Sequence, residues 1–206
     1  MIKNYSLFLL FFVFALQTST AQSFDLREMD ALVVRLESGR NKTKVIQEKL
    51  EAANSSEMKK YWQRELENTK LEIQTKNQFM RNAFEQEFKF AKVFYIYDYA
   101  AKDLKNGIVE GIFLNEKLES DPLISLEGKN FLLAAEGRST SSSEGIYLHH
   151  SNMARLQNSY LNFVKLNTLG LFFNNMFSST DARERMYTVA VQKLNRRFYK
   201  SQRLIE

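Results

Sequence analysis

Residues 93–99 read Val-Phe-Tyr-Ile-Tyr-Asp-Tyr, a run that is β-branched or aromatic on both of its alternating faces. Such a run is typical of a strand buried inside a sheet. Before residue 92 the pattern differs, because apolar residues recur every three or four positions, as they do on one side of a helix. The sequence therefore predicts a change at about residue 92, with helices before it and a sheet after it.

Two long helices are predicted before this change. Apolar residues recur at helical spacing over residues 25–53, with a lapse near Gly39, and again over residues 57–91. Residues 54–56, Asn-Ser-Ser, separate the two patterns, since asparagine suits the end of one helix and serine the cap of the next. Helices joined by three residues run antiparallel, so residues 22–91 are expected to form a helical hairpin.

The second of these helices carries the clearer apolar stripe, which includes Trp62, Leu66 and Ile73. On its polar side an acid precedes a base by four residues in two places, Glu72 with Lys76 and Glu85 with Lys89. Such pairs stabilise an exposed helix by a few tenths of a kcal/mol each.

After residue 92 the sequence predicts short strands and two helical segments. Residues 100–106 are expected to form a helical turn ended by Gly107, and a last helix follows Asp181 with Leu194 and Phe198 on its apolar side. Strands grouped between helices indicate an α+β fold with a mostly antiparallel sheet of about five strands and a C-terminal helix. Residues 92–206 then form an α+β domain with its own core. The strand candidates are residues 93–99, 108–114, 124–126, 131–135, 146–149 and 160–166.

The N-terminus has the features of an export signal. Lys3 is the only charge in the first 21 residues, residues 7–16 are all apolar, and Ser19 and Ala21 are the small residues that signal peptidase requires. We predict cleavage after Ala21, so that residues 1–21 are removed and the protein is periplasmic or extracellular. Ten apolar residues span only about 15 Å as a helix, too little for a membrane anchor, and no later apolar run is long enough to cross a membrane.

Composition excludes several classes of protein. The chain has no cysteine and two histidines, which excludes disulfide frameworks, thiol nucleophiles and cysteine-ligated metals. Its net charge of +5 over 206 residues is too small to indicate a nucleic-acid binder. No cofactor is expected, because Gly107 and Gly111 lack the Lys-Ser/Thr ending and the third glycine of nucleotide loops.

Asp98 is the strongest candidate for an acid with a functional role. It stands at the end of an apolar strand, where a buried carboxyl group would have a perturbed pKa. A pocket that combined it with neighbouring acids would suit a hydrolase that uses carboxylates, and the alternative is an acid that caps the turn after the strand. The neighbouring candidates are Asp103, Glu110, Glu116 and Glu119.

The histidines and the serine-rich loop are weaker candidates. His149 and His150 are adjacent on a predicted strand, so they point to opposite faces and are not expected to share a metal ion. The serines at 139 and 141–143 lack the Gly-x-Ser-x-Gly turn of a nucleophile and are interpreted as a solvated loop. No metal site is predicted.

The C-terminal helix ends in a basic cluster. Lys193, Arg196, Arg197 and Lys200 surround Phe198 in the sequence. Cations near a helix C-terminus complement the helix dipole, which is one interpretation. The other is that they bind an anionic surface, lipid headgroups or an acidic glycan, with Phe198 as an exposed anchor.

These observations favour an exported, non-enzymatic protein that acts by binding, either a protein partner or a second copy of itself through the hairpin. Two alternatives remain. One is a carboxylate-based hydrolase acting on an envelope sugar or peptide. The other is a holdase-like periplasmic chaperone. This chain resembles such chaperones in being exported and basic and in having a predicted helical hairpin. No motif assigns the chain to a family.

Overall fold

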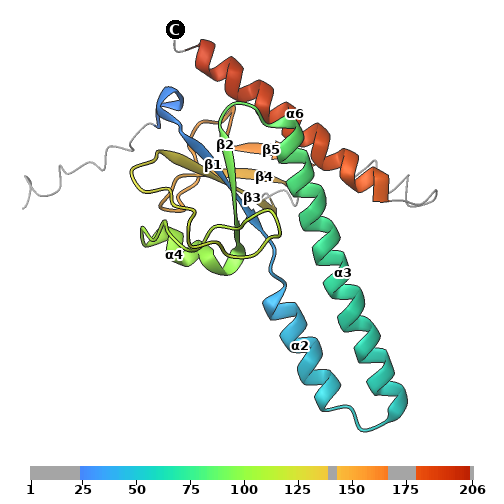
Figure 1. The fold of residues 1–206 in the computed structure, drawn as a ribbon. Helices are drawn as coiled ribbons and strands as arrows, with labels where there is room; N and C mark the ends of the chain where they lie inside the picture. The colour runs from blue at the N-terminus through green and yellow to red at the C-terminus, as the bar shows by residue number, and fades with distance from the viewer. Residues whose placement is uncertain (1–23, 139–142, 167–179, 205–206) are drawn as a thin grey trace, which may run out of the picture.

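The computed structural model describes residues 24–138, 143–166 and 180–204 (Figure 1). The predicted signal peptide and Ser139, Ser141 and Ser142 of the serine-rich loop lie outside these residues. Within them the chain is α+β, as predicted. The elements are η1 (Leu26–Glu28), β1 (Ala31–Leu36), α2 (Arg40–Glu51), α3 (Ser56–Glu87), β2 (Lys92–Tyr97), η2 (Asp98–Ala100), α4 (Ala101–Lys105), β3 (Phe131–Arg138), β4 (Glu144–His149), β5 (Phe163–Lys165) and α6 (Thr180–Arg203).

The described strands form one mixed sheet in the order β2-β1-β3-β4-β5. β1 pairs in parallel with both β2 and β3, whereas β4 pairs antiparallel with β3 and β5. The expectation of a mostly antiparallel sheet was therefore wrong. Two long crossovers, through α2 and α3 and then through α4 and the segment after it, make the parallel pairs possible.

The sheet is covered on both faces. Leu32, Val34 and Leu36 of β1 point to the face covered by α3 and α6, whereas Ala31 and Val33 point to the face covered by α4 and residues 107–126. This alternation follows from the period of two along a strand. β1 is buried on both faces because each face is covered in this way, and both of its edges are paired, one with β2 and the other with β3.

β1 corrects the prediction of a helix over residues 25–53. Its sequence, Ala-Leu-Val-Val-Arg-Leu, is a short apolar run, and such a run is compatible with either a buried strand or a buried helix. Gly39, with φ of 68°, separates the strand from α2. Residues 22–91 therefore contain a central strand as well as two helices, and the sheet includes elements from both sides of residue 92.

The later elements agree with the prediction in part. β2, α4, β3, β4, β5 and α6 lie where strands or helices were expected. Residues 108–114 and 124–126 are not strands, because only isolated bridges, Glu110 with Ser125 and Leu114 with Ser120, form there. These residues instead place Phe113 and Leu126 over the second face of the sheet.

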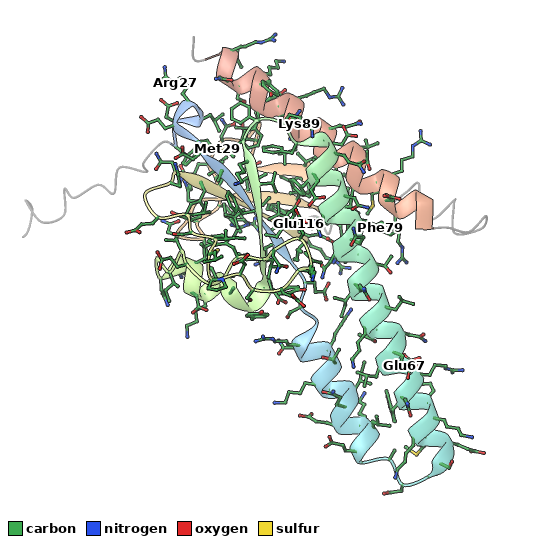
Figure 2. The ribbon with its side chains drawn as sticks, viewed as in Figure 1. Arg27, Met29, Glu67, Phe79, Lys89 and Glu116 are labelled. Carbon is green, nitrogen blue, oxygen red and sulfur yellow. The ribbon has the colours of Figure 1, made fainter. Side chains whose placement is uncertain are left out.

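α2 and the first part of α3 extend away from the sheet as a pair of helices, residues 40–75, which we call the arm (Figure 1). Ser55 caps α3 as expected, since its hydroxyl accepts a hydrogen bond from the Met58 backbone N–H at 3.1 Å. Figure 2 shows Glu67 on the part of α3 beyond the sheet, and Phe79 where α3 reaches it. From there Met80, Ala83 and Phe84 join the core.

Candidate functional site

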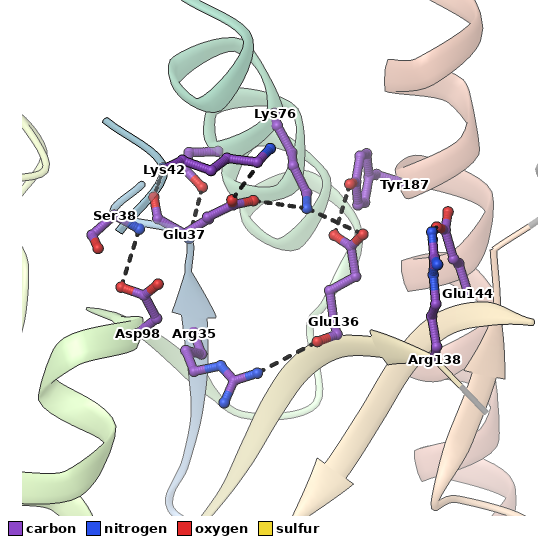
Figure 3. Close-up of polar contacts among 11 residues, drawn as sticks. Arg35, Glu37, Ser38, Lys42, Lys76, Asp98, Glu136, Arg138, Glu144 and Tyr187 are labelled. Atoms are coloured by element: carbon purple, nitrogen blue, oxygen red, sulfur yellow. Dashed lines mark hydrogen bonds and ion pairs between the residues drawn. The ribbon is translucent and has the colours of Figure 1, made fainter. Parts of the chain in front are cut away.

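Polar side chains gather at the carboxyl ends of β1 and β3 (Figure 3). The chain leaves these neighbouring strands in opposite directions across the sheet, from β1 toward β2 and from β3 toward β4. In doubly wound parallel sheets ligands bind at such a divergence point; here β1 and β3 are parallel, but β4 is antiparallel to β3. We call the residues there the Lys76 cluster. Its members are Glu37, Lys76, Asn77, Glu136 and Tyr187.

Lys76 holds two carboxylates together. Its Nζ lies 3.1 Å from Glu37 Oε2 and 3.2 Å from Glu136 Oε1, and all three side chains are partly exposed. Burial lowers the pKa of Lys76, but the two carboxylates raise it by more, so the pKa lies above its ordinary value. The predicted partner was Glu72, but Lys76 pairs instead with acids from outside its helix.

Glu136 faces the helices because it follows Leu132 and Ala134 on the same side of β3. Its Oε2 accepts a hydrogen bond of 2.9 Å from the hydroxyl of Tyr187 on α6. Burial and the negative charge of Glu136 raise the pKa of Tyr187. Glu136 therefore connects β3 to both α3 and α6.

Asn77 fixes the backbone of Glu37. Its side-chain oxygen accepts from the Glu37 N–H at 3.0 Å, and its side-chain nitrogen donates to the Glu37 carbonyl at 2.7 Å. Asn77 is only 5% exposed, so these two bonds satisfy a polar side chain inside the molecule. The base of the arm is thereby fixed to the end of β1.

Asp98 lies at the end of β2, near the Lys76 cluster, but it is exposed rather than buried (Figure 3). The expectation of a buried carboxyl group was wrong. Its Oδ1 accepts hydrogen bonds from the backbone N–H groups of Ser38, at 3.2 Å, and Tyr99, at 2.9 Å. These bonds agree with the alternative interpretation, an acid that satisfies the turn after the strand. No contact that the structure shows in its described residues joins it to Asp103, Glu110, Glu116 or Glu119.

The chemistry of the Lys76 cluster favours binding and rigidity over acid–base catalysis. A glycosidase needs one protonated carboxylic acid and a second carboxylate free to act on water or sugar. Here the ammonium of Lys76 contacts both carboxylates, so neither is free to act alone. Glu37 and Glu136 were not singled out from the sequence. One feature of the sequence could have identified Glu136 as a candidate site residue. It is a charged residue on the inward-facing side of an apolar strand.

Two residues of the basic C-terminal cluster have structural roles. Phe198 is 0% exposed and packs against Phe88 and Phe90, at ring-centroid distances of 5.3 and 5.0 Å, so the expectation of an exposed anchor was wrong. Arg197 donates to the carbonyls of Tyr160, at 2.9 Å, and Phe163, at 2.6 Å.

The remaining predicted cations, Lys193, Arg196 and Lys200, are exposed. All three lie on α6, on the side turned away from the core.

The histidines lie toward the opposite end of the strands from the Lys76 cluster, because β4 runs antiparallel to β3 and ends at His149. His149 Nδ1 is 3.2 Å from the Met153 carbonyl, and burial lowers the pKa of His149. His150 packs edge-on against Phe24 and lines an open cavity of about 700 Å³ together with Asn130 and Arg155. Among the described residues, no group of three or more His, Cys, Asp or Glu side chains is placed to hold a metal ion.

Comparisons with protein families, with curated proteins and with solved structures gave no significant match. No described helix combines the length and apolar character that crossing a bilayer requires.

Proposed function

We propose that this chain is an exported, non-enzymatic protein that binds a protein partner through the arm. The observation that carries the proposal is that the arm extends beyond the sheet and exposes apolar side chains on several sides. Export rests on the sequence of residues 1–21, and it implies the periplasm or the medium.

The arm is longer than the core requires. α3 has 32 residues and therefore measures about 48 Å, whereas a six-residue strand measures about 20 Å. α2 contains no buried residue, and within residues 56–75 of α3 only Leu66 and Ile73 are buried. The arm therefore buries few side chains and adds little to the core that the sheet forms with α3 and α6.

The exposed apolar residues lie where α2 cannot cover them. Leu71, which is 63% exposed, and Tyr61 stand about 140° around α3 from Leu66, on either side of its outer face. Val45 on α2 and Met58 near the tip are also about half exposed. Single exposed apolar residues are ordinary, but four on one projecting pair of helices indicate an interaction surface.

A holdase-like chaperone is the second candidate. The exposed apolar residues lie on different sides of the arm rather than in one groove, and scattered contacts of this kind suit an unfolded client. Self-association through the arm is a third outcome, because a second copy offers the same apolar residues. The hydrolase is disfavoured because Asp98, the acid on which it was based, is exposed and bonded to backbone N–H groups. The two carboxylates that the fold does bring together, Glu37 and Glu136, both contact Lys76.

Site-specific crosslinking distinguishes these possibilities. A photoreactive amino acid replaces Tyr61 or Leu71 in cells that express the chain, and the control position is Leu123, which is 91% exposed and lies outside the arm. One dominant adduct from positions 61 and 71 supports a specific partner, an adduct of twice the chain mass indicates self-association, and a broad mixture supports a holdase. Equal crosslinking at positions 61, 71 and 123 contradicts the proposal.

A further inference from the structure

The outer face of α6 is a row of cations without acids. The row extends about 27 Å along the helix, opposite the side that buries Tyr187, Leu194 and Phe198. The sequence contains no Asp or Glu between Glu184 and Glu206. We call this surface the cationic face. Its exposed cations are Arg185, Lys193, Arg196, Lys200 and Arg203.

The helix dipole explains only part of this row. Cations stabilise the last turn of a helix, so Lys200 and Arg203 are favourable there. The effect falls off within that turn and does not reach Lys193. Arg185 lies near the beginning of α6, where the dipole favours acids. The cationic face therefore needs another explanation.

The stability of α6 does not explain the cationic face either. Lys193 with Arg196, and Arg196 with Lys200, stand three and four residues apart, and like charges at these spacings repel. None of the ion pairs that the structure shows in its described part includes a cation of this face. An anionic partner would remove the repulsion.

Apolar side chains among the cations indicate the kind of partner. Val189 is 48% exposed and Leu204 is 75% exposed on this side of the helix. Tyr199 is partly exposed, but its ring packs against Phe90 and its hydroxyl donates to the Lys89 carbonyl. A soluble polyanion leaves such side chains in water. The boundary between lipid headgroups and acyl chains accepts apolar side chains and cations together.

We propose that the cationic face binds the anionic headgroups of a lipid surface, with α6 lying along the surface. The cations contact phosphate groups, and Val189 and Leu204 enter the headgroup layer. The tip of the arm lies at the opposite end of the molecule from the C-terminal end of α6, so a chain bound in this way keeps the tip accessible (Figure 1).

Vesicle binding tests the proposal with the chain from Gln22 onward, which contains every described residue. The wild-type chain should sediment with vesicles of phosphatidylcholine that contain phosphatidylglycerol, and not with phosphatidylcholine alone. Replacing Lys193, Arg196 and Lys200 with glutamine should weaken binding about a hundredfold, since each cation near an anionic surface contributes about fivefold. Thermal melting should change little, because all three side chains are exposed and the one ring contact among them, Lys200 with Tyr160 at 5.6 Å, lies at the surface.

A control variant loses the same number of positive charges from the arm instead of from α6. Lys59, Lys60 and Lys70 on the arm are exposed, and their replacement with glutamine lowers the net charge by the same amount. This variant should bind vesicles within about twofold of wild type. If it loses binding as much as the α6 variant does, binding depends on net charge and the proposal is wrong.

A second variant separates lipid from other polyanions. Val189→Ser combined with Leu204→Ser should weaken vesicle binding at least severalfold and leave binding to soluble dextran sulfate unchanged. If this variant binds vesicles as wild type does, the apolar residues do not enter the lipid, and an acidic glycan replaces lipid as the partner. Absence of wild-type binding to anionic vesicles at low salt also overturns the proposal.

Discussion

Gly39 packs against the side chain of Ile73, so closely that a Cβ atom on Gly39 would lie 2.2 Å from Ile73 Cδ1. Gly39 also has φ of 68°, a conformation that side chains other than glycine rarely adopt. It occupies the short connection between β1 and α2. The close approach of Ile73 to Gly39 therefore helps to position α2 relative to the sheet, together with the bonds of Asn77 to the Glu37 backbone.

We predict that Gly39→Ala lowers the free energy of unfolding by about 2–3 kcal/mol, through backbone strain and overpacking. Gly128→Ala is the control, because Gly128 has φ of 67° but nothing lies within 4 Å of its Cβ position. It should cost only about 1 kcal/mol. Urea denaturation measures both changes.

Shortening the side chain of Ile73 tests whether overpacking against Ile73 contributes to the loss of stability in Gly39→Ala. Ile73→Val removes the Cδ1 atom and alone should cost about 1 kcal/mol. In the Gly39→Ala background it should be neutral or stabilising, because the clash disappears. Additive losses in the double variant would show that Gly39→Ala acts through backbone strain alone.

The buried side of the arm gives a second prediction. Leu66→Asp places a charge between α2 and α3 and should cost at least 2 kcal/mol, whereas Glu67→Ala on the exposed side should change stability by less than about 0.5 kcal/mol. Hydrogen exchange should show the loss of protection in residues 40–75 and much less in β1 and β3. Equal effects of the two substitutions would mean that the helix faces are misassigned.

The sequence correctly predicted the elements that have a distinctive residue pattern of their own. α3 and α6 have many turns of amphipathic spacing, and β2 has an unmistakable β-branched and aromatic composition. β1 was missed because a six-residue run with five apolar residues fits a helix and a doubly buried strand equally well. The position of β1 between β2 and β3 depends on pairing with residues about 60 and 100 positions away, which no local pattern reveals.

The Lys76 cluster was missed for the same reason. Local spacing predicts that Lys76 pairs with Glu72, one turn away, but the fold brings Glu37 and Glu136 from two strands to its Nζ. For Phe198 the sequence supported two interpretations, a core position on the apolar side of the last helix and an exposed anchor. Only the packing against Phe88 and Phe90 decides between them.

Processing of the N-terminus gives a third prediction. The mature protein should begin at Gln22, because Ser19 and Ala21 provide the small residues before the cleavage site. Intact-mass measurement of protein recovered from the envelope and the medium tests this. Recovery of the chain with Met1 in the membrane fraction would contradict cleavage.

The last prediction concerns alkaline pH. The pKa values of Tyr187, Tyr95 and Lys76 are raised in the folded protein, the tyrosines mainly by burial and Lys76 by its two carboxylates. A raised pKa means that the folded state retains its proton after the unfolded state has lost it. The stability that these groups contribute is therefore complete below about pH 10 and is lost as the pH rises above it.

Tyr187→Phe isolates one of these groups. At pH 7 it should cost about 1–2 kcal/mol, because Glu136 loses a hydrogen bond from a buried hydroxyl. Between about pH 10 and 11 the free energy of unfolding should fall less steeply than in wild type, because one fewer group releases a proton on unfolding. Urea titrations across this range measure both effects. An unchanged slope would mean that Tyr187 ionises equally in the folded and unfolded states, and that its bond to Glu136 does not hold the proton in place.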